Sequence, residues 1–177
     1  MKTKRITYAA VCAALGAAAV VLCAYTPVNI VPLFFYSAAL YLSLRLVGAW
    51  GLLTAAVSLL LSFFTAGGFT DTFVLTLVMF TPYAFLVYFL RKIAYTDVKY
   101  CLIRGAAVVV FYLIEAFAAV MLAGFLTGVD FTVIIDKIGI WALFVMFALI
   151  SVPTDFFFVF ATDKVLKIIE KRTGEDG

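Results

Sequence analysis

Long apolar runs, separated by short polar or glycine-containing breaks, make up most of this chain. A helix needs roughly 20 apolar residues to cross the hydrocarbon core of a bilayer, and runs of about that length recur. Of the 177 residues, 67% are hydrophobic and 13% are charged, whereas a soluble domain carries about a quarter charged residues. The sequence therefore predicts an all-α, polytopic membrane protein, a six transmembrane helix bundle with a single domain over residues 1–177. The spans are expected near residues 6–25, 30–46, 48–66, 71–91, 102–127 and 138–163.

The distribution of positive charge predicts how the six spans are oriented. Lys and Arg accumulate in the cytoplasmic loops of membrane proteins. With the N-terminus inside, 12 of the 13 Lys and Arg residues lie on the cytoplasmic side, and Lys137 alone lies outside. We therefore expect a multi-pass protein with both termini in the cytoplasm. A five-span alternative requires the second and third segments to form one re-entrant hairpin.

The residue types that carry much of enzyme chemistry are scarce in this sequence. It has no histidine, which excludes His-based triads and most zinc and haem sites. Cys12, Cys23 and Cys101 stand singly in or beside apolar runs, so they are interpreted as small hydrophobic residues. A G-x-x-x-x-G-K-[ST] loop for ATP is also missing. We expect a protein that is not an enzyme and that uses no metal or cofactor.

The first span is rich in alanine, although larger aliphatic residues are better suited to lipid. At 100° per residue, Ala10, Ala14 and Ala17 fall on one face of a helix, and Val11 and Leu15 lie on the far side. Small residues four apart allow two helix backbones to approach closely. The alanine face is therefore expected to contact a partner helix, either within the same bundle or in another protein.

The order of these features resembles the substrate-binding S components of energy-coupling factor (ECF) vitamin transporters. Ala10–Ala14 (AVCAA) occupies the place of that family's alanine face. The segment SAALYLSLRLVGAWGLLTAAVSLLLS resembles the family's Leu/Gly/Ala-rich second and third helices with their short basic turn. Val152–Asp155 (VPTD) resembles the Pro-x-Asp of the family's final span, and a Lys/Arg-rich end follows it. The resemblance covers nearly the whole chain.

This resemblance implies a high-affinity substrate-binding subunit of an ECF-type importer for a small vitamin or related micronutrient, in the cell membrane of a prokaryote. In that family the alanine face docks against a transmembrane scaffold subunit, which two cytoplasmic ATPases drive. Carried over to this chain, Ala10 and Ala14, with Ala17 on the same face, form the subunit-docking surface. The loaded bundle is then expected to topple in the membrane before it delivers its substrate.

Polar and aromatic side chains inside the later spans indicate where a ligand could bind, because polar groups are costly in lipid. Stripes on the fourth, fifth and sixth spans could together line a pocket that opens to the outside. The loop after the first span resembles the loop that covers the pocket in S components. Alternatively, the threonines bond to their own helix and the tryptophan is an interfacial anchor. The predicted substrate-binding residues are Tyr25, Asn29, Thr72, Thr76, Tyr83, Glu115, Ala119 and Trp141.

Glu115 is the most informative of these candidates because it lies near the middle of its span. An ionised carboxylate that faces lipid is unfavourable, so Glu115 must be protonated, paired or in contact with a ligand or water. A ligand amine or ring N–H is one candidate partner. The alternative is a neutral carboxyl group that bonds to the hydroxyl of Tyr83 or Tyr112.

Asp155 is expected to have a structural role. It lies closer to the inner end of the last span, where the long side chain of Arg45 could reach it from the second span. Pro153 frees a carbonyl group and is expected to kink the helix. For Asp155 we therefore favour a structural role, as an ion pair with Arg45 or as a hinge with Pro153, over contact with a ligand.

Two other functions fit the same sequence. In span number and length the chain also resembles the rod-shape MreD family of the cell-wall elongation machinery, in which the alanine face would bind a morphogenetic partner and no ligand would enter. A small channel or ion-coupled carrier would use Glu115 and Asp155. However, the first two spans offer few polar residues to line a continuous path.

Overall fold

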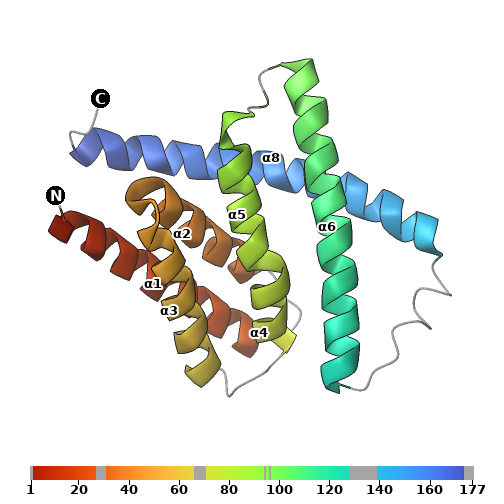
Figure 1. The fold of residues 1–177 in the computed structure, drawn as a ribbon, viewed down its shortest axis with the longest axis horizontal. Helices are drawn as coiled ribbons and strands as arrows, with labels where there is room; N and C mark the ends of the chain where they lie inside the picture. The colour runs from red at the N-terminus through yellow and green to blue at the C-terminus, as the bar shows by residue number, and fades with distance from the viewer. Residues whose placement is uncertain are drawn as a thin grey trace.

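The computed structural model describes residues 2–26, 31–65, 71–93, 95, 97–127 and 139–173, and every regular element within them is a helix (Figure 1). The all-α prediction is confirmed for this part of the chain. In order, the elements are α1 (Lys2–Tyr25), α2 (Val31–Val47), α3 (Trp50–Thr65), α4 (Asp71–Leu75), the π-helix η1 (Thr76–Phe80), α5 (Thr81–Phe89), the 3-10 helix η2 (Leu90–Lys92), α6 (Val98–Thr127) and α8 (Ile140–Thr173).

Two stretches of the described chain, Ile6–Tyr25 and Thr72–Lys92, are long and apolar enough to cross a membrane. The apolar helices α2 and α3 are shorter, with 17 and 16 residues. Many large apolar side chains lie on the surface: Phe64 and Phe89, for example, are 76% and 75% exposed. Such a surface is compatible with a membrane protein, because lipid replaces water around it.

A glycine-containing turn sets the close antiparallel packing of α2 and α3. Gly48 adopts a φ of 63°, a left-handed conformation that suits glycine at the end of a helix. Gly51 then packs directly on α2: a Cβ atom there would lie 2.6 Å from Leu44 Cδ2 and 2.9 Å from Leu44 Cα. A larger residue at position 51 would push the two helices apart.

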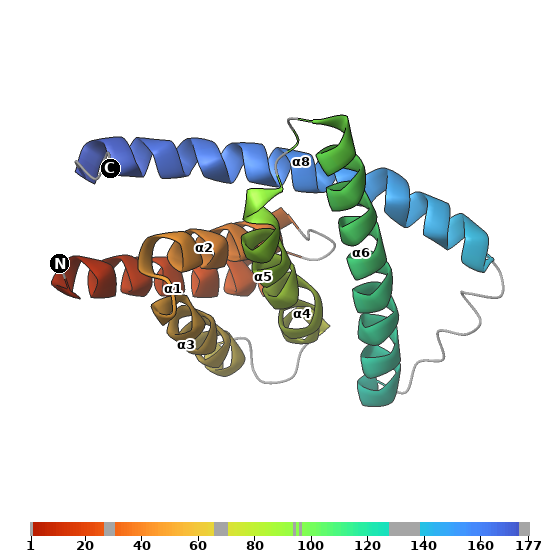
Figure 2. The ribbon, with the colours of Figure 1, turned by 45° about the horizontal axis from the view of Figure 1, so that its top comes forward.

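Helix α2 is the central element of the bundle. It packs against α1, α3, α5 and α8, while α6 packs against α8 and η1. Figure 1 shows α1, α2 and α3 together on one side of the molecule and α6 on the other, with α8 passing behind α5 and α6. Helix α8 runs continuously through Pro153 for 34 residues, and its direction changes part-way along (Figure 2).

Small residues bring α1 close to α3. Ala13, Gly16 and Ala17 are buried on the inward face of α1. The Ser58 hydroxyl of α3 donates a hydrogen bond to the Ala13 carbonyl at 3.1 Å. A Cβ atom on Gly16 would lie 3.0 Å from Ser58 Oγ. The backbones therefore approach as closely as side chains of this size allow.

The fourth predicted span is interrupted by the π-helical turn η1. The Thr81 N–H and hydroxyl both bond to the Thr76 carbonyl, five residues earlier, and Pro82 follows in the first turn of α5. Ser37 of α2 donates to the Phe80 carbonyl at 2.9 Å. The turn is thus stabilised by hydroxyl groups, and it rotates α5 relative to α4.

Candidate functional site

A buried ion pair joins α6 to α8 near one end of the bundle. Arg104 Nε lies 2.7 Å from Asp155 Oδ2, and Arg104 Nη2 donates to Oδ1 at 3.3 Å. The two side chains are 1% and 0% exposed. A two-pronged contact of this kind fixes the orientation of both groups, because the planar guanidinium fits the carboxylate.

Other groups complete the hydrogen bonding of this pair. Tyr83 of α5 donates to Asp155 Oδ1 at 3.0 Å, and Tyr95 donates to Oδ2 at 2.6 Å. Arg104 Nη1 donates to the carbonyls of Leu90 and Ile93 at 2.9 and 3.0 Å. Within the described chain, no fully buried side-chain nitrogen or oxygen lacks a hydrogen-bond partner. We call Arg104, Asp155, Tyr83 and Tyr95 the polar centre.

The polar centre holds α5, the following connection, α6 and α8 in one arrangement. Burying an ion pair is costly unless hydrogen bonds satisfy the remaining donors and acceptors, as they do here. Burial and the adjacent Asp155 carboxylate raise the pKa of the Tyr95 phenol, so that Tyr95 remains a donor at neutral pH. With all its groups engaged, the polar centre is suited to structure rather than to chemistry.

The predicted partner of Asp155 was wrong. Asp155 forms a buried ion pair, but with Arg104 and not with Arg45. Arg45 Nη1 lies 3.8 Å from Asp163 Oδ1, about two turns further along α8 than Asp155, and donates to the Tyr41 hydroxyl at 2.9 Å. Both arginines lie near span ends of equal expected depth. The packing of α6 on α8 determines which arginine reaches Asp155, and the sequence alone does not reveal this packing.

The polar stripe predicted on the fourth span is divided in the structure. Thr76 is fully buried and donates to the Thr72 carbonyl of its own helix at 2.7 Å. Tyr83 is 1% exposed and belongs to the polar centre. The expectation of one face assumed 100° per residue throughout, whereas η1 lies between these positions and changes the register.

The other predicted ligand residues lie apart from this stripe. Tyr25 and Trp141 are 73% and 78% exposed. Glu115 is half-buried on α6, and no hydrogen bond or ion pair to its carboxylate occurs among the described residues. Asn29 and the side chain of Ala119 lie outside the described part of the chain. A common pocket for all eight residues therefore stays a prediction.

The alanine face predicted on α1 is split between two environments. Ala17 is 8% exposed and belongs to the inward face. Ala10 and Ala14 are exposed, and their neighbours Val11 and Leu15 are 51% and 60% exposed. The within-bundle partner therefore accounts for Ala17, while Ala10 and Ala14 remain available to another molecule. We call Ala10, Val11, Ala14 and Leu15 the outward face of α1.

Sequence reasoning did not single out Arg104 and Tyr95. Arg104 is only two residues inside the predicted fifth span, which is the one signal that could have drawn attention to it. No family model, curated protein or solved structure matches the chain in the comparisons with known proteins.

Proposed function

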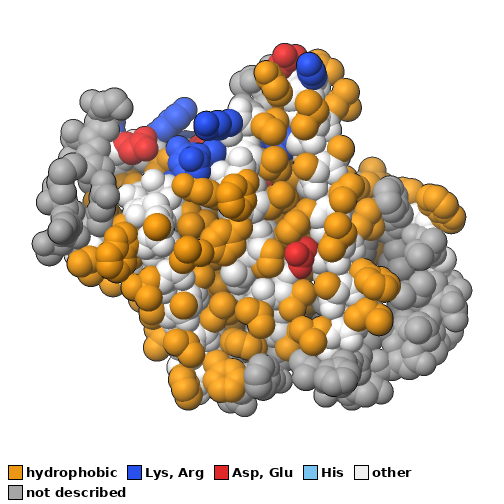
Figure 3. All heavy atoms as spheres, viewed as in Figure 1, with side chains coloured by type: hydrophobic (Ala, Val, Ile, Leu, Met, Phe, Trp, Pro, Cys, Tyr) orange, Lys and Arg blue, Asp and Glu red, His pale blue; other side chains and the backbone are white. Residues whose placement is uncertain are grey.

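We propose that this protein is the substrate-binding membrane subunit of an ECF-type importer for a small vitamin or related micronutrient. The proposal places its helices as six spans in a prokaryotic cell membrane, with the N-terminus inside. Two apolar helices of spanning length and the wide apolar surface in Figure 3 support the membrane location. The family resemblance of the sequence supplies the transport role.

The exposure of Ala10 and Ala14 carries this proposal. Other small residues of α1 pack against α3, so the need for close packing within the bundle already explains them. It does not explain Ala10 and Ala14, which are exposed beside the larger Val11 and Leu15, since lipid has no preference for small side chains. A helix of a scaffold subunit that packs closely against Ala10 and Ala14 would explain why these positions carry small side chains.

Glu115 supports a ligand role in the same proposal. Its carboxylate is half-buried in the middle of α6, and the described residues offer it no cationic partner. A ligand N–H would satisfy it. We propose that the nutrient carries such a donor and that Glu115 binds it directly.

A second function is favoured by a different observation. The hydroxyl groups of Thr76 and Tyr83, two of the predicted ligand residues, donate their hydrogen bonds to partners within the chain. A structural protein of the cell-wall elongation machinery would need no ligand pocket and would use the outward face of α1 for a morphogenetic partner. We keep this as the alternative.

One preparation separates the two functions. The full-length protein is purified from its own host in mild detergent, and its bound small molecules and co-purifying subunits are identified by mass spectrometry. Two ATPases, a membrane scaffold and a retained metabolite are expected for the importer. A cell-wall partner with no metabolite would contradict the importer and support the alternative.

A further inference from the structure

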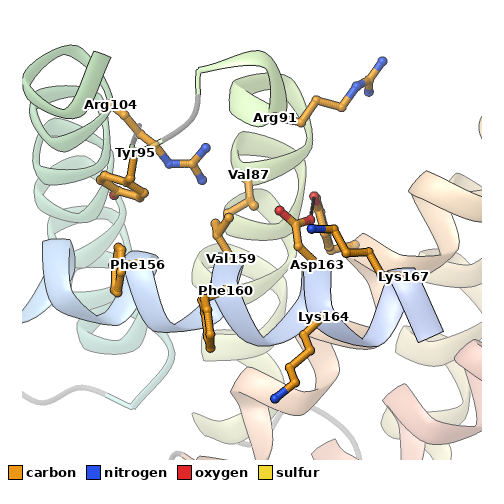
Figure 4. A pocket seen from close by; sticks show the side chains of 11 residues that line it. Val87, Arg91, Tyr95, Arg104, Phe156, Val159, Phe160, Asp163, Lys164 and Lys167 are labelled. Carbon is orange, nitrogen blue, oxygen red and sulfur yellow. Dashed lines mark hydrogen bonds between the residues drawn. The ribbon is translucent and has the colours of Figure 1, made fainter. Parts of the chain in front are cut away.

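A cavity of about 360 Å³ lies where α8 passes the end of α5 and η2. Figure 4 shows its lining side chains, which come from α2, α5, η2, α6, α8 and the connection that contains Tyr95. The cavity lies beside the polar centre but is not filled by it. None of the eight predicted substrate-binding residues lines it.

The lining of this cavity changes from apolar to basic along α8. Phe156, Val159 and Phe160 come first, and Lys164 and Lys167 follow Phe160 one and two turns later, with the carboxylate of Asp163 beside them. The spacing of three and four residues keeps these positions on one side of the helix. The lining from α5 and η2 also changes from apolar to basic, because Val87 is followed four residues later by Arg91. The cavity thus has an apolar end and a cationic end.

The cationic end carries charge that the protein does not neutralise. Arg104 is paired with Asp155, and Arg45 lies 3.8 Å from Asp163. Arg91, Lys164 and Lys167 form no ion pair within the described residues. In Figure 4 the Arg91 guanidinium points away from Lys167, and it lies 4.0 Å from the centre of the Tyr88 ring, so Arg91 would have to turn toward α8 to share an anion with Lys167. Figure 3 shows basic side chains gathered along this edge of the apolar surface.

We propose that this cavity binds an anionic phospholipid, with its phosphate between Arg91 and Lys167 and an acyl chain along Phe156 and Phe160. The two rings stack with centroids 6.5 Å apart and an interplanar angle of 12°, yet they are 46% and 62% exposed. A soluble phosphate would leave them uncovered, whereas an acyl chain would bury them. The lipid phosphate would accept charge-assisted hydrogen bonds from the cations.

This inference rests on the membrane location in the proposed function, but not on transport. Lipid binding at the basic end requires neither a nutrient nor a scaffold. A protein that takes up no nutrient could therefore still bind the lipid, and a protein that binds no lipid could still be an importer subunit.

The test uses the full-length protein in a neutral detergent, with phosphatidylglycerol or phosphatidylcholine of identical acyl chains. Native mass spectrometry measures the fraction of protein that retains one lipid. Wild-type protein should prefer phosphatidylglycerol about tenfold or more: both lipids carry the phosphate, but phosphatidylcholine also brings its choline cation close to Arg91 and Lys167, and one such repulsion is worth about that factor. The double variant Arg91→Gln/Lys167→Gln should lose this preference.

The matched control is Lys92→Gln/Lys99→Gln, which removes the same charge from exposed positions that do not line the cavity. It should retain phosphatidylglycerol like the wild type. Equal loss in both double variants would overturn the site, since general surface charge would then explain binding. Equal retention of the two lipids by the wild type would also overturn it.

A third arm separates lipid from free phosphate. Inorganic phosphate in large excess should not displace phosphatidylglycerol, because it lacks an acyl chain to cover the two rings. Phe160→Ala should weaken lipid retention while it leaves the unfolding temperature close to that of the wild type. Complete displacement by inorganic phosphate, or full retention by Phe160→Ala, would overturn the lipid assignment.

Discussion

In the polar centre, Arg104 and Asp155 form hydrogen bonds within their own chain at every buried side-chain atom, whereas Ala10 and Ala14 on the outward face of α1 are exposed. Both features are unexpected for a helix surrounded only by lipid. The polar centre is closed, so changes there should act on the stability of the fold. The outward face is open, so changes there should act on assembly and leave the fold intact.

The largest expected effect is the loss of stability on removing one side of the buried pair. Asp155→Ala leaves the Arg104 guanidinium buried without its counter-charge, which should lower the free energy of unfolding by about 3–5 kcal/mol. Asp163→Ala is the matched control, because its pair with Arg45 is 29% and 44% exposed, and it should cost about 1 kcal/mol or less. Thermal and denaturant unfolding in detergent measures both variants. A similar loss of unfolding free energy for the two variants would show that the polar centre does not depend on its buried ion pair.

The inward face of α1 should respond to a larger side chain more strongly than the outward face. A Cβ atom on Gly16 already lies 3.0 Å from Ser58 Oγ, so Gly16→Leu should destabilise the protein by about 1–3 kcal/mol through overpacking. Ala14→Leu should change the unfolding free energy by only about 0.5 kcal/mol. The same unfolding assay compares them. If Ala14→Leu is the more damaging change, the assignment of the two faces is wrong.

Glu115→Gln tests whether the open carboxylate on α6 binds the nutrient. Loss of its charge should weaken a ligand that donates an N–H by more than about 1.5 kcal/mol, or roughly tenfold. The amount of metabolite that stays with the purified protein measures this directly. Retention equal to that of the wild type would remove Glu115 from the binding site.

Tyr95→Phe should have the smallest effect on the polar centre, because Asp155 keeps its other donors. Removal of the 2.6 Å hydrogen bond should cost about 1 kcal/mol. The pKa of Tyr95 is raised above its usual value, so its contribution is complete below the unfolded-state pKa of about 10 and is lost only as the pH rises through the folded-state value. The difference between wild type and variant should therefore be the same at about pH 7 and about pH 9. A difference that becomes smaller between these pH values would show that the folded protein does not raise the pKa of Tyr95.

The sequence predicted where the helices begin and end better than how they face one another. The glycine turn after α2 is a local signal, and the limits of α2 and α3 lie within two residues of those predicted, whereas α6 begins four residues before its predicted span and α8 ends ten residues after its own. The partner of Asp155 was not local: Arg45 and Arg104 were equivalent by depth, and only the packing of α6 against α8 separates them.

The division of the candidate ligand stripe had a similar cause. A π-helical turn depends on a shifted hydrogen bond from Thr81 to Thr76, and the regular spacing of the sequence gives no sign of it. Periodicity also placed Ala10, Ala14 and Ala17 together, but could not tell which of them meets the neighbouring helices. That distinction needed the positions of α2 and α3.

The central claim is that the outward face of α1 is a docking surface for another protein. Ala14→Leu is compared with Ala106→Leu, the same change at an exposed position of α6, in intact cells of the host. We measure nutrient uptake and the co-purification of the scaffold and the two ATPases. Ala14→Leu should abolish both while the isolated protein unfolds at its normal temperature, and Ala106→Leu should change neither. Undiminished uptake and an intact complex with Ala14→Leu would contradict the account.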